Sequence, residues 1–145
     1  MIIDSGLPIN STLLVAAIAW FTAQALKFIF LLITDKKVDF TRFVGSGGMP
    51  SSHTSLCTSM AVAVGRIEGW NSVIFAVACI FSAVVMYDAA GVRRAAGEQA
   101  KVLNELMYSH FDPNQISKRL KELLGHTPLE VFAGAILGIA LGFLL

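Results

Sequence analysis

The sequence predicts an all-α integral membrane protein, a helical bundle of about four spanning helices with amphipathic helices on its inner side. Two observations lead to this fold class. First, 55% of the 145 residues are hydrophobic and only 14% are charged, whereas about 25% of the residues in a typical soluble domain are charged. Second, the apolar residues gather in runs, of which the longest reaches the roughly 20 residues that a spanning helix needs. A chain of this length is expected to form a single membrane-embedded domain, residues 1–145.

Four apolar segments are the candidates for the spans. The longest covers residues 13–33 and is interrupted by few polar residues, among them Lys27. Residues 71–87 and 129–145 form two shorter runs, and residues 54–65 form a fourth that can span only with its polar ends included. Because short spans thin the bilayer or pack together, we expect a compact bundle.

The basic residues predict how the chain is oriented. All but two of the 11 Lys and Arg residues fall in two connections, residues 34–52 and 88–127. With four spans these connections lie on the same side, which the positive-inside rule makes cytoplasmic. We therefore expect both termini outside and both basic connections inside, in a cell membrane or a plastid-type inner membrane.

The longer basic connection is expected to contain two amphipathic helices. Residues 92–107 place an apolar stripe that includes Val92 and Leu103 on one helical face. Residues 112–115 carry helix-start signals, and the basic helix that they begin is expected to end at Gly125. A basic amphipathic helix beside a bilayer usually lies on its surface.

A glycine- and serine-rich turn, residues 47–54, leads directly into an apolar helix. Gly48, Ser51 and Ser52 offer backbone N–H groups and hydroxyls beside a helix N-terminus, which can bind an anion such as phosphate. His53 adds a side chain that can transfer a proton. In the simpler interpretation, Ser51 or Ser52 is only the N-cap of the helix, and both interpretations stay open.

A second turn, residues 125–130, opens the last apolar segment. His126 and Glu130 are four residues apart, a spacing at which the carboxylate can accept the imidazole N–H and orient the ring. Thr127, Pro128 and Glu130 also fit a capping box, in which the Glu130 carboxylate bonds back to the Thr127 N–H. The two oxygens of the carboxylate allow both roles.

The third candidate segment, residues 87–94, contains two arginines. Arg94 has Glu98 one turn further on, so an exposed ion pair explains it. Arg93 has no acidic residue at that spacing and shares its helical face with Ala and Gly residues, so we expect it to be the better anion ligand. Asp88 can pair with an arginine or cap the helix.

Lys27 is a charge within the first predicted span. Such a charge costs free energy in a bilayer, so a partner or a function is expected. The alternative is that the ammonium group reaches back to the inner headgroups along its own apolar stem.

The predicted topology gathers several reactive side chains at one membrane face. They are His53, His126, Arg42, Arg93 and Arg94. Two histidines, two helix N-termini and several arginines suit phosphoryl transfer, in which one histidine attacks phosphorus and the other protonates the leaving oxygen. Neither a metal nor a cofactor is implied, and a net charge of +1 argues against a nucleic-acid partner.

The three segments resemble the divergent PAP2 family, small membrane proteins related to type 2 phosphatidic acid phosphatases and vanadium haloperoxidases. The resemblance rests on Gly-Gly-Met-Pro-Ser-Ser-His-Thr at 47–54, Val-Met-Tyr-Asp-Ala-Ala-Gly-Val-Arg-Arg at 85–94 and Leu-Gly-His-Thr-Pro-Leu-Glu-Val at 124–131. It implies a PAP2-like bundle that hydrolyses a lipid phosphate or pyrophosphate. By this resemblance His126 would be the nucleophile that becomes phosphorylated, Glu130 its orienting group and His53 the general acid.

The phosphate-binding residues of the family carry over with substitutions. No lysine stands seven residues before Arg42, so Lys27 or Lys36 would replace the lysine of the family's first motif. Leu120 stands where the third motif has an arginine, so Arg93 or Arg94 would supply that charge. The glycine and serines of the first turn complete the expected phosphate site.

Two functions are compatible with these residues. One is a membrane enzyme, and the other is a non-catalytic membrane protein that keeps a phosphate pocket for binding, regulation or transport. The expected partners are a lipid phosphate and the bilayer itself. Gly134, Gly138 and Gly142 recur every four residues, and such small residues let helices approach closely in lipid. This strip is expected to pack against another span of the chain or against its copy in a homodimer.

Overall fold

The computed structural model describes residues 10–35, 48–110, 120 and 125–145. These residues fold almost entirely into helices, so the all-α prediction is confirmed. The elements are α1 (Ser11–Asp35), α2 (Ser52–Glu68), α3 (Val73–Tyr87), the short π-helix η2 (Asp88–Val92), α4 (Arg93–His110) and α5 (Pro128–Leu144). The amphipathic helix predicted after residue 112 lies outside the described residues, except for its expected end at Gly125.

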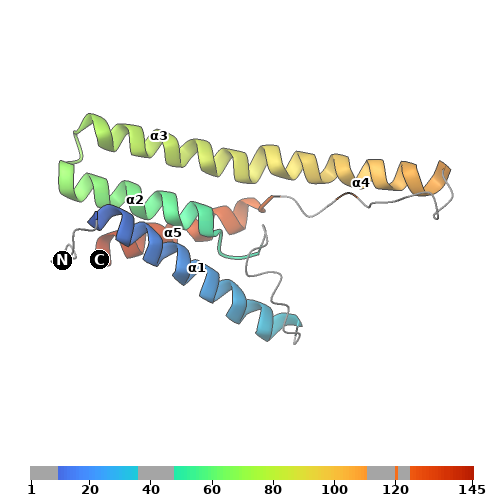
Figure 1. Cartoon of the computed structure of the whole chain (residues 1–145), viewed down its shortest axis with the longest axis horizontal. Coiled ribbons are helices and arrows are strands. Elements are labelled where there is room, and N and C mark those ends of the chain that lie inside the picture. The colour runs from blue at the N-terminus through green and yellow to red at the C-terminus, as the bar shows by residue number, and fades with distance from the viewer. Residues whose placement is uncertain (1–9, 36–47, 111–119, 121–124) are drawn as a thin grey trace.

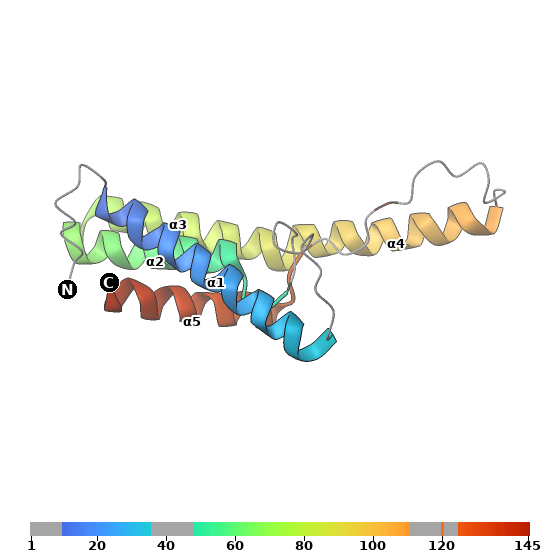
Figure 2. The same cartoon turned by 60° about the horizontal axis from the view of Figure 1, so that its bottom comes forward.

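Four helices run side by side, with α2 in contact with α1, α3 and α5 (Figures 1 and 2). The start of α1, the end of α5 and the α2–α3 turn lie at one end of this bundle. The starts of α2 and α5 and the end of α1 lie toward the other end. The two predicted basic connections therefore begin and end on the same side, as the up-and-down topology requires.

The outer surface of the bundle suits a bilayer. Ser11–Phe30 and Val73–Ser109 are long and apolar enough to cross a membrane, and α5 is a shorter apolar helix. Large apolar side chains face outward, including Phe21 at 64% and Ile80 at 67% exposure. Exposed apolar area on this scale is unfavourable in water, so the membrane character of the chain agrees with its fold.

Helix α2 is the least apolar of the four, and it is the central one. Its Ser and Thr residues are buried, and the hydroxyls of Ser55, Thr58 and Ser59 donate to backbone carbonyls. Ser55 Oγ donates to Ala19 O of α1 at 3.3 Å, and Thr58 Oγ1 donates to Ala135 O of α5 at 3.4 Å. Small and hydroxylated residues are typical of helix interfaces within membranes. Helix α2, Ser52–Glu68, includes the predicted apolar run 54–65 and its polar ends.

The glycine strip of α5 packs against α2 within the chain. A Cβ at Gly142 would lie 2.7 Å from Val62 Cβ, and one at Gly134 would lie 3.1 Å from Ser51 Cβ. At Gly138 a Cβ would overlap the backbone oxygen of Ser55. A homodimer through the same strip would have to displace α2.

The segment after α3 differs from the expected separate amphipathic helix. Helix α3 continues through η2 into α4 as one long rod, which reaches well beyond the other described helices (Figure 1). No proline interrupts residues 87–110, so nothing in the sequence ends the helix there.

The predicted apolar stripe of this segment faces outward. Val92 and Leu103 are 58% and 50% exposed, whereas Ala100 and Asn104 on another face are buried. The Asn104 side chain forms two hydrogen bonds with the backbone of Leu120, at 2.9 and 3.0 Å. Small residues on this face permit that close approach.

Candidate active site

The candidate site is built where α2 and α5 begin. The Ser51 N–H donates to the Glu130 carbonyl at 3.0 Å, which fixes the first turn of α5 beside the start of α2. Ser51 is the N-cap of α2, as the simpler interpretation predicted, because its hydroxyl accepts from Thr54 N at 3.4 Å. Ser51 and Ser52 are both buried. The two turns that the sequence singled out are therefore neighbours in space.

The third candidate segment is tied to the same place by its backbone. The His126 N–H donates to the carbonyl of Ala89, in η2, at 3.0 Å. A π-helical turn changes the backbone hydrogen-bond pattern of a helix, and such turns are frequent at functional sites. The small residues of this face, Ala89 among them, predict that another backbone can approach here, but the sequence did not predict that His126 is the partner.

The two histidines come close together, His53 from the first turn of α2 and His126 from the turn that precedes α5. The ring centroids of His53 and His126 are 6.3 Å apart, with an angle of 79° between the ring planes. His126 is 3% exposed, whereas His53 is exposed. One imidazole is thus shielded, and the other can exchange protons with its surroundings.

Glu130 forms the predicted capping box. Its Oε2 accepts from Thr127 N at 3.1 Å, and its own N–H donates to Thr127 Oγ1 at 3.3 Å. A carboxylate has more acceptor sites than this one bond uses. Its second predicted role, to orient His126, therefore stays a prediction.

Lys27 reaches this site from α1. Its side chain is buried, and its stem lies against Gly48, where a Cβ would be only 3.2 Å from Lys27 Cγ. Gly48 has φ +90°, so both its conformation and its contact favour glycine. Of the two lysines considered for the phosphate site, Lys27 lies here, and Lys36 is outside the described residues.

Of the three predicted arginine ligands, the structure describes the side chain of Arg94 only. Arg94 pairs with Glu98 at 3.2 Å on an exposed surface, so the predicted ion pair is confirmed. Arg93 begins α4, one residue after η2, but its side chain and all of Arg42 lie outside the described part of the chain. The Asp88 backbone N–H bonds to the carbonyls of α3 at the joint with η2. Phosphate binding by Arg42, Arg93 and Arg94, and pairing of Asp88 with an arginine, stay predictions.

Comparisons with known proteins support the family resemblance of the three segments. A family model described as the divergent PAP2 family matches residues 9–141. The chain is 40% identical to an uncharacterized membrane protein, YuiD, of Bacillus subtilis (strain 168), over 148 aligned residues that cover 94% of each chain. No solved structure matches the chain.

Proposed function

Because the chain belongs to the divergent PAP2 family, we propose that it is a membrane phosphatase that hydrolyses a lipid phosphate or pyrophosphate through a phosphohistidine intermediate. The observation that carries the proposal is the 6.3 Å separation of the His53 and His126 rings. A nucleophile attacks from about 3–3.5 Å, and a general acid lies about 2.6–3.2 Å from the atom that it protonates. Both reaches start from ring nitrogens, and the two target atoms are bonded to each other, so rings this close can contact the same phosphoryl group.

The reaction has two steps. In the first, a ring nitrogen of His126 attacks phosphorus, the bond to the lipid oxygen breaks, and His53 donates its proton to that oxygen. In the second, water attacks the phosphorus, His53 takes a proton from it, and the bond to His126 breaks to release inorganic phosphate. The exposed His53 can exchange its proton with the surroundings between the two steps.

The phosphate charge is neutralised from two sides. The buried Lys27 supplies a cation next to Gly48, and the starts of α2 and α5 both carry backbone N–H groups in their first turns. We add Arg93 to this set on the basis of its position at the start of α4. A cytoplasmic site, as the basic connections predict, belongs to the same proposal.

Release of inorganic phosphate by the purified protein in detergent tests the proposal. We expect turnover of phosphatidic acid or a prenyl pyrophosphate, loss of turnover in His126→Ala, and labelled phosphate trapped on His126. His110→Ala, a histidine at the far end of α4, is the matched control and should keep the wild-type rate. An unchanged rate in His126→Ala would eliminate the phosphohistidine mechanism.

A second function is favoured by one observation. Two of the predicted site residues already have structural partners, since Glu130 caps α5 and Arg94 pairs with Glu98. A protein that binds a phosphate group without hydrolysing it needs only a cation and backbone N–H groups, which Lys27 and the starts of α2 and α5 would supply. Saturable binding of inorganic phosphate without turnover would favour this alternative.

A further inference from the structure

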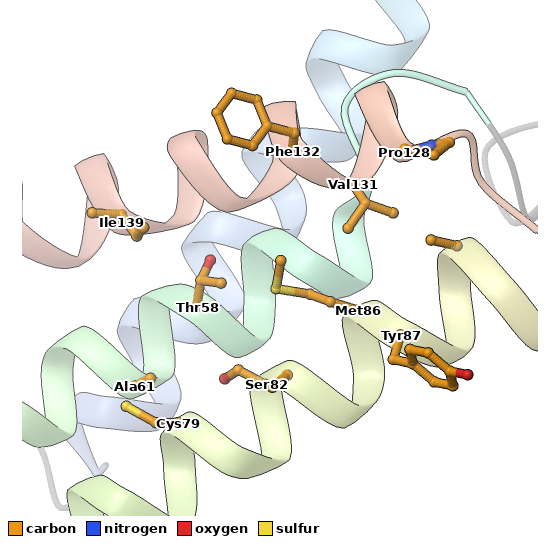
Figure 3. Close-up of a pocket in the computed structure, with 12 residues that line it drawn as sticks. Thr58, Ala61, Cys79, Ser82, Met86, Tyr87, Pro128, Val131, Phe132 and Ile139 are labelled. Carbon is orange, nitrogen blue, oxygen red and sulfur yellow. The ribbon is translucent and has the colours of Figure 1, made fainter.

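An open groove of about 620 Å³ runs along one side of the bundle (Figure 3). Helices α3 and α5 form its walls, and Thr58 and Ala61 of α2 form its floor. The walls both pack on α2 but, over the described residues, make few contacts with each other. The groove therefore opens sideways, toward the apolar surroundings of the bundle.

The chemistry of the lining is that of hydrocarbon. Val131, Phe132 and Ile139 line the wall from α5. The two hydroxyls deeper in the groove are already used within the protein. Thr58 Oγ1 donates to Thr54 O at 2.8 Å, and Ser82 Oγ donates to Ala78 O at 2.8 Å. Such a surface favours an apolar ligand and leaves a polar headgroup without partners.

One end of the groove lies next to the candidate site. Ala90 and Pro128 line one end, directly beside the hydrogen bond from His126 N to Ala89 O. From Pro128 to Ile139 the groove follows α5 for roughly 16 Å, at a rise of about 1.5 Å per residue. The hydrocarbon core of a bilayer is about 30 Å thick. The groove is thus about as long as one leaflet of that core is thick.

We infer that this groove binds one acyl chain of a glycerolipid phosphate whose phosphate group lies at the histidines. The inference rests on the proposed function for the position of the headgroup. A leaflet-deep groove that is open to the bilayer admits a lipid by lateral diffusion, without removing its chains from the membrane. It also places the phosphorus at the end where both histidines lie.

Photolabelling of the wild-type protein tests the inference without requiring turnover. The probe is phosphatidic acid with a diazirine in one acyl chain, in phosphatidylcholine vesicles, and the control probe is phosphatidylcholine with the same diazirine. We expect the phosphatidic acid probe to label groove residues of α3 and α5, and the control probe to label the outward faces. The same labelling pattern for both probes would overturn the inference.

A pair of substitutions on α3 provides a second measurement. Cys79 lines the groove, whereas Ile80 beside it is 67% exposed and points away. Cys79→Trp should reduce groove labelling about tenfold, and Ile80→Trp should leave it unchanged. Equal labelling in the two variants would refute the groove. Groove labelling without phosphate release would refute the proposed function but not acyl-chain binding in the groove. Phosphate release without groove labelling would refute acyl-chain binding but not the proposed function.

Discussion

Glu130 has two roles in the proposed enzyme, and a pair of substitutions separates them. In the capping box it accepts from Thr127 N at 3.1 Å, and the Thr127 hydroxyl accepts from Glu130 N at 3.3 Å. As the orienting group of His126 it must carry a negative charge. Glutamine also completes a capping box but is neutral, so Glu130→Gln keeps the first role and removes the second. Thr127→Ala does the opposite.

The expected effects differ in kind as well as in size. Loss of a threonine N-cap costs about 0.5–2 kcal/mol of stability, so Thr127→Ala should lower the free energy of unfolding by about 1 kcal/mol. A charge-assisted hydrogen bond is worth about 1.5–3 kcal/mol, and 1.36 kcal/mol is tenfold in rate. Glu130→Gln should therefore lower kcat by about 10- to 150-fold.

The assay is phosphate release from phosphatidic acid in detergent, beside unfolding followed by circular dichroism. Because either substitution can lower stability, kcat is normalised to the folded fraction. Thr127→Ala should keep kcat within about twofold of the wild type. If Glu130→Gln keeps the full kcat while Thr127→Ala loses it, Glu130 is only a cap, and the reasoning about His126 is refuted.

Three further predictions concern phosphate binding and packing. Arg93→Ala should raise the dissociation constant of inorganic phosphate about tenfold or more. Arg94→Ala should change that constant less than about twofold, because its exposed ion pair is worth little. Equal effects of the two substitutions would contradict the preference for Arg93. Lys27→Met should weaken phosphate binding with little loss of stability, and tight binding in this variant would remove Lys27 from the site. Gly138→Leu should destabilise the protein by about 1–3 kcal/mol through overpacking, whereas Ala140→Leu on the exposed face should be neutral, and detergent unfolding distinguishes the two.

The features that the sequence predicted well are local or depend on counting charges. The N-cap at Ser51, the capping box at Thr127 and the Arg94–Glu98 pair all form between residues at most four apart, so spacing alone determines whether they can meet. The common side of the basic connections follows from the number of spans. Each of these needs no knowledge of how the helices pack.

The features that the sequence did not predict depend on long-range contacts. The hydrogen bond from His126 to Ala89 joins residues 37 positions apart through their backbones, and backbone groups carry no mark in the sequence. The sequence did not predict that α3 continues into α4, because the apolar run ends at residue 87 whereas the helix continues. The helix continues where hydropathy changes, since hydropathy and helix propensity are separate properties.

The fold and the candidate site depend on the same helix contact. The glycine strip lets α5 lie against α2 along its length, from Ser51 at Gly134 to Val62 at Gly142. The Ser51–Glu130 hydrogen bond forms at the end of this contact, and His126 precedes it by one helical turn. Any residue that separates the two helices therefore also moves His126 relative to His53 on α2. Gly138→Leu should consequently reduce turnover per folded molecule as well as stability, although Gly138 follows His126 by about three helical turns of chain.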